Sequence, residues 1–408
     1  MPKLSNRAAL LPESPIRKLV PFAESAKRRG IHVYHLNIGQ PDIPTPPEFF
    51  QAIKDADIEV LAYSHSAGNQ TLREQIADYY GRLGHSLDVD QINVTTGASE
   101  ALGFVFASLM NQEDQVIVPE PFYANYSSFS LANSAQVIPV PSRIEDHFAL
   151  PTMEEFEAKI TDQTRAILIC NPGNPTGVIY PQEALEQLKT IVQKHDLFLI
   201  ADEVYREFAY DGRKHCSTLG LSGIEKNVVV IDSISKRFSA CGARIGCVIS
   251  RNPELMQSVL KLSQARLSPP TYGQVGAEAV YQLPQSYYDS VVDEYSARRD
   301  LLKSSLESIE GVVCPDVDGA FYAMVRLPVD SAERFCQWML EEFDHEGETV
   351  MMAPGEGFYA TPGFGVDEVR IAYVLNQQDL GKAMKCLEAG IAAYPGRTSE
   401  ADSLAASN

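Results

Sequence analysis

The chain contains no long hydrophobic run. None of its segments approaches the ~18 consecutive apolar residues of a membrane-spanning helix. The N-terminal stretch MPKLSNRAALLPESPIRKL also lacks the apolar core of a secretory signal. We therefore expect a cytoplasmic protein without membrane contact.

Basic residues are scarce relative to acidic ones. Lysine and arginine total 34 against 54 aspartates and glutamates, which gives a net charge of -20 at pH 7. This balance excludes a nucleic-acid-binding surface and favours a soluble, acidic protein. The charge of a substrate stays open, because one local basic pocket can override the field of the whole molecule.

Cysteine and histidine form no recognisable framework. The seven cysteines are scattered between positions 170 and 386 without a C-x-x-C pair, and the eight histidines do not cluster. This distribution excludes a disulfide scaffold and a zinc site, and it suits a reducing compartment. No H-E-x-x-H, Walker A or G-x-S-x-G pattern occurs either. We expect no bound metal.

One glycine motif imitates a nucleotide-binding fingerprint. Residues 355–360 (GEGFYA) fit the loose G-x-G-x-x-G/A pattern. A dinucleotide site needs a helix directly after this pattern, whereas Pro362, Gly363 and Gly365 break the chain at once. A nicotinamide-dependent enzyme is therefore excluded.

Short apolar runs alternate with helical patterns through the middle of the chain. Residues 182–195, for example, carry apolar side chains at helical spacing. The runs are bounded by Pro, Gly, Asn, Asp or Ser and read as buried strands. The expected strands are 116–118, 166–170, 197–201, 228–231 and 247–249. The alternation predicts an α/β fold with a mostly parallel sheet covered by helices on both faces.

A smaller α+β domain is expected toward the C-terminus. The polar, partly helical stretch 286–309 indicates a boundary, and an α+β pattern follows over residues 311–393. The first 45 residues lack a core of their own and should pack on this second unit. The predicted organisation is an N-terminal arm (1–45), a large domain that carries the motifs described next (46–285), a small domain (286–395) and a disordered polar tail (396–408).

The run SISKRFSACGARIG at residues 233–246 is the most informative segment. Lys236 follows Ser233 and Ser235, and Arg244 stands eight residues further on. A lysine at the end of a strand can carry a carbonyl cofactor as a Schiff base. Neighbouring hydroxyls and a guanidinium can hold a phosphate. Taken alone, an S-x-S-K run is better explained as a solvated loop after a strand, but the arginine at this spacing weakens that interpretation.

Two other motifs follow predicted strands directly. NPGNPTG occupies residues 171–177 and ADEVY residues 201–205. As a turn and a helix N-cap, neither needs a function. Both nevertheless lie at the sheet edge where α/β proteins bind ligands. There Asn174 would offer an amide, Asp202 a carboxylate that keeps a heterocyclic nitrogen protonated, and Tyr205 a hydroxyl.

A third motif, NVTTGASE at residues 93–100, precedes a helical pattern. A Thr/Gly/Ser turn that opens a helix presents free backbone N–H groups and the positive end of the helix dipole. This arrangement suits a phosphate, although every capped helix resembles it.

Together these segments resemble the pyridoxal-phosphate aminotransferases of fold type I, class I/II (aspartate aminotransferase-like). The resemblance runs from LNIGQPD at residues 36–42 to Arg370, and NPGNPTG, ADEVY, SISK and GARIG occur in the family's order and spacing. It implies pyridoxal 5'-phosphate as cofactor, with amino-acid and 2-oxo-acid substrates. The implied reaction transfers an amino group from an L-amino acid to a 2-oxo acid through a Schiff base on Lys236.

The resemblance also implies a role for each matching residue. Lys236 matches the Schiff-base lysine and proton shuttle, and Asp202 matches the partner of the pyridine nitrogen. Asn174 and Tyr205 match the donors to the ring's phenolic oxygen, and Tyr123 matches the aromatic side chain that stacks on the ring. The phosphate cup is matched by Gly97, Ala98, Ser99, Ser233, Ser235 and Arg244.

Substrate and partner contacts are implied in the same way. Arg370 matches the arginine that binds the substrate α-carboxylate, with Asn174 beside it, and Gly39 matches the glycine that lets the backbone approach the substrate. Tyr63 matches the tyrosine that reaches the phosphate of a neighbouring subunit, so a homodimer is implied. Arg266 lies near the position where some relatives read an acidic side chain, as in aspartate or glutamate donors. Its register differs, and an exposed arginine or an intersubunit salt bridge is the alternative.

Two other functions stay open at this stage. A lyase on the same fold would eliminate a β-substituent from a cysteine-type substrate and release ammonia and pyruvate without an added 2-oxo acid. A non-catalytic binding protein is the third option. The presence of Lys236 argues against it, because a pure binder needs no shuttle lysine.

Overall fold

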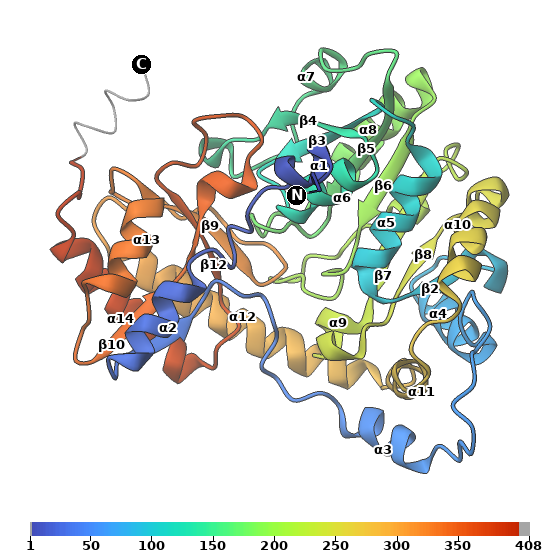
Figure 1. The fold of residues 1–408 in the computed structure, drawn as a ribbon, viewed down its shortest axis with the longest axis horizontal. Coiled ribbons are helices and arrows are strands. Elements are labelled where there is room, and N and C mark those ends of the chain that lie inside the picture. The colour runs from blue at the N-terminus through green and yellow to red at the C-terminus, as the bar shows by residue number, and fades with distance from the viewer. Residues whose placement is uncertain (1, 400–408) are drawn as a thin grey trace.

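A seven-stranded sheet forms the centre of the larger part of the molecule (Figure 1). The computed structural model describes residues 2–399. The strand order is β2-β8-β7-β6-β5-β3-β4, in which β4, β3, β5, β6 and β7 are parallel and β8 pairs antiparallel with β7 and β2. The strands are β2 (Ile92–Thr95), β3 (Gln115–Glu120), β4 (Gln136–Pro141), β5 (Thr164–Cys170), β6 (Phe198–Asp202), β7 (Val228–Ser233) and β8 (Gly246–Ile249).

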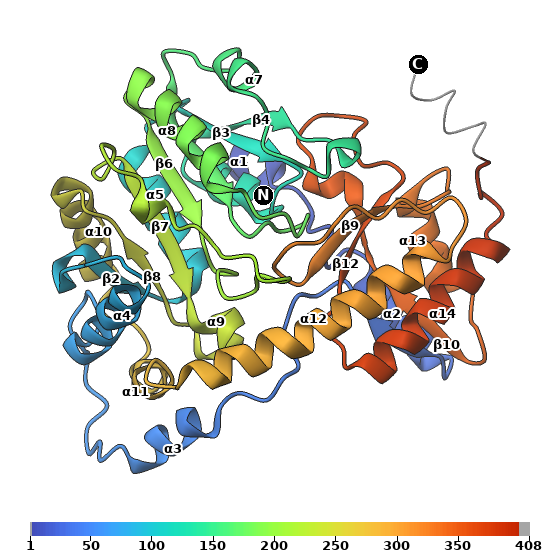
Figure 2. The same ribbon diagram turned by 180° about the vertical axis from the view of Figure 1, so that it is seen from behind.

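Helices cover both faces of this sheet, as the two opposite views show (Figures 1 and 2). Alternate residues of β7 separate the two sides: Val229 and Ile231 pack with α5 and α10, whereas Val228 and Val230 pack with α4, α8 and α11. These helices are α4 (Gln70–Arg82), α5 (Gly97–Leu109), α8 (Gln182–His195), α10 (Pro253–Arg266) and α11 (Thr271–Val280). Burial on both faces explains the continuous apolar runs, and the predicted α/β fold class is confirmed.

The two strands that the sequence did not suggest are the edges of the sheet. β4 is only partly buried, and two prolines interrupt its apolar residues, so it does not show the pattern of a central strand. β2 is buried, but it includes Asn93, whose side chain accepts a hydrogen bond from Ser263 at 2.8 Å. Asn93 interrupts the apolar pattern of this strand, and its partner Ser263 is too distant in the sequence to be recognised.

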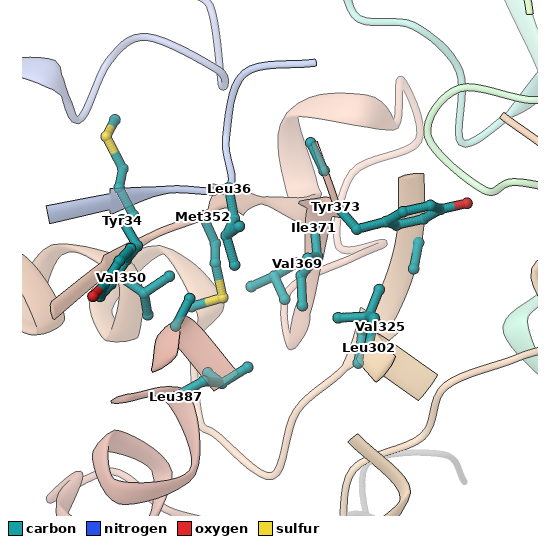
Figure 3. Close-up of a cluster of buried hydrophobic side chains, with 14 of the residues drawn as sticks. Tyr34, Leu36, Leu302, Val325, Val350, Met352, Val369, Ile371, Tyr373 and Leu387 are labelled. Carbon is teal, nitrogen blue, oxygen red and sulfur yellow. The ribbon is translucent and has the colours of Figure 1, made fainter. Parts of the chain in front are cut away.

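The smaller part combines the C-terminal region with part of the N-terminal segment. β1 (His32–His35) pairs in parallel with β10 (Glu348–Met351). A second sheet has the antiparallel order β11-β12-β9, formed by β11 (Ala353–Pro354), β12 (Glu368–Ala372) and β9 (Tyr322–Arg326). In Figure 3, Tyr34 and Leu36 lie in one apolar cluster with Leu302, Val369 and Leu387. Residues far apart in the chain therefore share this core.

The other helices complete both parts. They are α1 (Asn6–Leu10), α2 (Val20–Arg28), α3 (Pro47–Asp55), α6 (Asn125–Ala132), α7 (Met153–Glu157), α9 (Ile234–Arg237), α12 (Gln285–Glu307), α13 (Ala332–Glu341) and α14 (Gln377–Ala393). α1 does not follow the rest of the N-terminal segment, because Arg7 donates to the carbonyl oxygen of Ala132 at 2.9 Å, beside the large sheet. None of the helices among residues 2–399 is long and apolar enough to cross a bilayer.

The long helix α12 links the two parts (Figure 1). Near its start Tyr288 packs in the large core, whereas Tyr295 and Leu302 pack in the small one. A continuous helix thus begins at the predicted boundary and runs from one core into the other. The division at residues 45 and 285 stays a prediction. The backbone N–H of Thr398 donates to Pro328, which ties the start of the predicted tail to the small part; residues 400–408 lie outside the described residues.

Candidate active site

Most of the predicted site residues line one cavity of about 370 Å³. It opens beyond the carboxyl ends of β5, β6 and β7, where the NPGNPTG, ADEVY and SISK motifs meet. The predicted residues on its wall are Gly39, Ala98, Ser99, Tyr123, Asn174, Asp202, Tyr205, Ser233, Ser235, Lys236, Arg244 and Arg370. Gly97 lies behind this wall against Arg244, and Tyr63 and Arg266 lie elsewhere.

Lys236 is presented by the short helix α9, which begins directly after β7. Ser233 caps this helix, because its Oγ accepts a hydrogen bond from the Ser235 N–H at 3.1 Å. The half-buried Nζ of Lys236 donates to the carbonyl oxygen of Gly39 at 2.7 Å. The amine therefore points into the cavity and meets no carboxylate there.

Asp202 ends β6 and is buried, with 5% of its surface exposed. The hydroxyl of Tyr126 donates to Oδ2 at 2.7 Å, and the backbone N–H of Val204 donates to Oδ1 at 3.3 Å. Burial raises the pKa of Asp202 to about 6, while these two hydrogen bonds oppose the rise. A buried carboxylate without a cation in contact is suited to receive a protonated nitrogen from a ligand.

The predicted phosphate site lies at the start of α5. Gly97 has φ +75°, and a Cβ at this position would lie 2.3 Å from Nη2 of Arg244, so only glycine admits the guanidinium. Arg244 itself has a left-handed backbone (φ 55°), and its Nη1 donates to the carbonyl oxygen of Cys241 at 3.0 Å. The Ser233 and Ser235 hydroxyls are 2.8 Å apart on the same wall. Hydroxyls, a helix N-terminus and a guanidinium thus converge.

Arg370 lies on the cavity side of β12, opposite Val369 and Ile371, which pack in the small core. It is 1% exposed. Its Nη1 donates to Oδ1 of Asn174 at 3.0 Å and its Nη2 to the carbonyl oxygen of Asn37 at 2.5 Å, whereas Nε has no partner. Among residues 2–399, no acid forms an ion pair with this guanidinium, which leaves its charge for an anionic ligand.

Four residues of this region escaped the sequence analysis. Tyr126 reaches Asp202 as described, and Asn125 donates to the hydroxyl of Tyr123 at 2.7 Å. Tyr322 lies 3.0 Å, oxygen to oxygen, from Tyr205. The fourth is an arginine of the N-terminal segment, Arg17, which lines the cavity. Only the position of Tyr126, one helical turn after Tyr123, offered any signal.

Arg266 and Tyr63 are not brought to the cavity. The Arg266 guanidinium pairs with Glu100 at 2.8 Å and donates to the carbonyl oxygen of Ser66 at 3.0 Å. The ion pair connects the end of α10 to α5, and Arg266 does not line the cavity. Tyr63 is 76% exposed.

Comparison with known proteins gives a consistent result. The family described as "Aminotransferase class I and II" matches residues 31–387. The aspartate aminotransferase of Bacillus subtilis is 30% identical over 394 residues, which cover 94% of this chain and 97% of the relative. The arginine–pyruvate transaminase of Pseudomonas aeruginosa is 32% identical over 365 residues, covering 88% and 89%. A solved structure of a Thermus thermophilus aspartate aminotransferase mutant superposes with a TM-score of 0.87 at 27% identity, over 96% of this chain and 100% of that one.

The chain belongs to the class I and II aminotransferases. It is a pyridoxal-phosphate-dependent enzyme that transfers the amino group of an amino acid to a 2-oxo acid. The comparisons give no support to the lyase that the sequence left open.

The cavity fits this cofactor by its own chemistry. The space that Gly97 leaves for the Arg244 guanidinium provides a cradle for a phosphate. Burial raises the pKa of Asp202, and among residues 2–399 no cation forms an ion pair with its carboxylate, so a pyridinium nitrogen would supply the missing partner. The free amine of Lys236 between these two points suits an aldehyde.

Proposed function

We propose that this cavity is the active site and that Lys236 attaches the cofactor's aldehyde and then moves the proton at the substrate Cα. The observation that carries the proposal is the convergence of Lys236, Asp202 and Arg370 on one cavity from three separate segments. When bound, pyridoxal 5'-phosphate supplies a protonated ring that withdraws electrons from the substrate Cα.

The chain's own residues would hold the cofactor at three points. Asp202 would pair with the ring nitrogen, Asn174 and Tyr205 would donate to the phenolic oxygen, and Tyr123 would stack on the ring. The phosphate would lie among Gly97, Ala98, Ser99, Ser233, Ser235 and Arg244. The hydrogen bonds and burial described above support this arrangement, because each of these groups except the stacking Tyr123 ring offers a side-chain or backbone donor or a charge to its part of the ligand.

The substrate would be oriented by its α-carboxylate. Arg370 presents two nitrogens that are already held by Asn174 and Asn37, so the guanidinium loses little freedom when it binds an anion. Gly39 lies beside the amine of Lys236 and keeps the backbone close to the substrate. With the carboxylate fixed, the amine of Lys236 would be placed to take the proton from the substrate Cα and to hold it for return, which is its proposed role as proton shuttle.

We propose dicarboxylic amino acids as one substrate class, with Arg17 rather than Arg266 as the group that receives the side-chain carboxylate. Several relatives are named aspartate aminotransferases. Four cationic side chains line the cavity: Arg17, Lys236, Arg244 and Arg370. The last three have tasks with the cofactor and the α-carboxylate. Within residues 2–399, no hydrogen bond or ion pair engages the Arg17 guanidinium, whereas Arg266 is committed to Glu100.

We further propose a cytoplasmic homodimer in which Tyr63 reaches the partner's phosphate site. Val60, Leu61 and Tyr63 are 77%, 59% and 76% exposed, an apolar group that a second copy would cover. All seven cysteines carry free thiols, which supports a reducing compartment.

A half-reaction screen tests the proposed function. The protein loaded with pyridoxal 5'-phosphate is mixed with each amino acid in turn, and the absorbance of the lysine-bound cofactor is followed. We expect this absorbance to convert to that of the amino form, and to return when a 2-oxo acid is added. Absence of any conversion contradicts the proposal, and steady release of ammonia and pyruvate without a 2-oxo acid indicates the lyase.

A further inference from the structure

Four side chains form a closed ring of contacts that connects the predicted carboxylate site to the predicted ring-oxygen site. Nη1 of Arg370 donates to Oδ1 of Asn174 at 3.0 Å, and Nδ2 of Asn174 points to the hydroxyl of Tyr205 at 3.5 Å. The hydroxyls of Tyr205 and Tyr322 are 3.0 Å apart. The ring of contacts closes because the Arg370 guanidinium lies 4.5 Å from the centre of the Tyr322 ring. Tyr322 therefore touches both the predicted carboxylate site and the predicted ring-oxygen site.

The position of Tyr322 is fixed by burial and by close packing against Gly39. It is 2% exposed, and its hydroxyl occupies the space in front of Gly39, where a Cβ would lie 1.7 Å away. The carbonyl of Gly39 in turn accepts the hydrogen bond of Lys236 at 2.7 Å. Gly39 therefore leaves room for the Tyr322 hydroxyl at the cavity wall, and the Arg370 guanidinium over the ring stabilises this position.

The direction of the hydrogen bond between the two hydroxyls has a chemical consequence. A phenol has one proton to donate and can accept at the same time. If Tyr205 gave its proton to Tyr322, it could not donate to a ligand. We propose that Tyr322 donates to Tyr205 and thereby leaves the Tyr205 proton directed at the cofactor's phenolic oxygen. Tyr322 is then a positioning residue that acts through Tyr205, an inference that rests on the proposed function.

This role predicts a spectroscopic effect. A hydrogen bond to the phenolic oxygen stabilises negative charge there, and the oxygen competes for the proton of the neighbouring nitrogen that joins cofactor and lysine. Without the Tyr322 hydroxyl, the Tyr205 oxygen loses an accepted hydrogen bond that polarises its O–H group. Tyr205 then donates more weakly to the phenolic oxygen, and the negative charge on that oxygen is less stabilised. The nitrogen then keeps its proton to a higher pH. Weakening a hydrogen bond to a charged oxygen by this cooperative effect corresponds to a shift of roughly a few tenths of a pH unit.

The test compares Tyr322→Phe with Tyr295→Phe in the protein loaded with pyridoxal 5'-phosphate. Tyr295 is a matched control, since its buried hydroxyl has no hydrogen-bond partner and its ring stacks at 5.3 Å on Phe321, next to Tyr322. We expect Tyr322→Phe alone to raise the pH at which the bound cofactor changes its absorbance. It should also lower kcat about tenfold while KM for the amino acid changes less than about twofold. An unchanged titration, or the same shift in Tyr295→Phe, overturns the proposal.

A second variant separates action through Tyr205 from general damage. Tyr322→Phe is added to Tyr205→Phe, and the same absorbance titration is measured. If Tyr322 acts through Tyr205, the double variant titrates like Tyr205→Phe. An additional shift of full size contradicts the proposal, even if Tyr322→Phe folds less stably. A wild-type protein that binds no cofactor would instead refute the proposed function itself.

Discussion

The hydroxyl of Tyr126 donates a hydrogen bond of 2.7 Å to Oδ2 of Asp202, and both side chains are buried. In the described part of the chain, this hydroxyl and one backbone N–H at 3.3 Å are the only hydrogen-bond donors to the carboxylate. The fold thus holds an acid where its charge is poorly solvated, and a cationic ligand would relieve the cost. The buried charge of Asp202 therefore lowers the stability of the cofactor-free protein at the site where the ligand binds.

Asp202→Asn should stabilise the cofactor-free protein at pH 7.5 while abolishing most turnover. The pKa of Asp202 in the folded state is about 6, above its ordinary value of 3.8, so the folded state holds this proton more tightly than the unfolded state does. The resulting penalty is absent below the ordinary value, grows as pH rises and is complete above about pH 6. Removal of the charge should contribute roughly 1–3 kcal/mol at pH 7.5.

The measurement is urea unfolding of the cofactor-free wild type and variant at pH 7.5 and pH 4.5. The gain should shrink at the lower pH, because wild-type Asp202 is then largely protonated in the folded state. A gain of equal size at both pH values would show that the charge is not its cause.

Lys236→Ala should remove the absorbance of lysine-bound cofactor and lower transamination by roughly 10³-fold or more. The physical reason is the loss of both the attachment point and the base at the substrate Cα. Absorbance spectra and turnover are compared with those of Lys189→Ala, which removes a helix lysine paired with Glu186 at 2.8 Å outside the cavity. Normal spectra and turnover in Lys236→Ala would exclude it as the attachment site.

Arg370→Lys should raise KM for the amino acid about 10- to 100-fold, with a smaller effect on kcat. Lysine keeps the charge but loses the planar fork that binds a carboxylate with two nitrogens, and it leaves Oδ1 of Asn174 without its 3.0 Å donor. Steady-state kinetics are compared for an amino acid and for the corresponding amine without an α-carboxylate. If both substrates suffer equally, Arg370 does not read the carboxylate.

Arg17→Gln should lower kcat/KM for aspartate and glutamate about tenfold or more and change that for alanine less than about twofold. A guanidinium without an internal partner contributes its charge to a bound carboxylate. Lys18→Gln is the matched control, since the adjacent Lys18 pairs with Glu333 and does not line the cavity. A uniform loss for acidic and neutral substrates would assign Arg17 a structural role.

Mixed dimers test the proposed contribution of Tyr63 to the partner's site. If Tyr63 acts in the partner's site, Tyr63→Ala and Lys236→Ala should each be inactive or impaired. A dimer with one subunit of each variant has one complete site, which combines Lys236 of the first subunit with Tyr63 of the second. Random reassociation makes half of the dimers mixed, so about a quarter of wild-type activity should return. Assays of the mixture and of the separate variants give the answer. No recovery despite verified subunit exchange would mean that Tyr63 does not act across an interface.

Short sequence patterns, namely apolar runs and the motifs that follow them, predicted much of the fold and of the site. The apolar run 228–231 followed by SISK predicted both strand β7 and the location of Lys236 at its end. A parallel strand buried on both faces must be apolar throughout, and the residue after it must emerge at the ligand edge of the sheet. The same logic placed Asn174 and Asp202, and strand alternation placed Arg370 opposite the core.

Long-range packing decided what the sequence could not. Arg17 and Tyr322 reach the cavity only because β1 pairs with β10 and β12 with β9, contacts between segments hundreds or tens of residues apart. Arg266 turned inward to Glu100 for the same kind of reason. By itself, then, the sequence determined the α/β class and the chemistry of its strand-end motifs, because these depend on neighbours along the chain. Tertiary structure alone decided which residues outside the motifs, such as Arg17 and Tyr322, also line the cavity. The reason is that a tyrosine or arginine has the same local preferences in a core, at a surface or in a site.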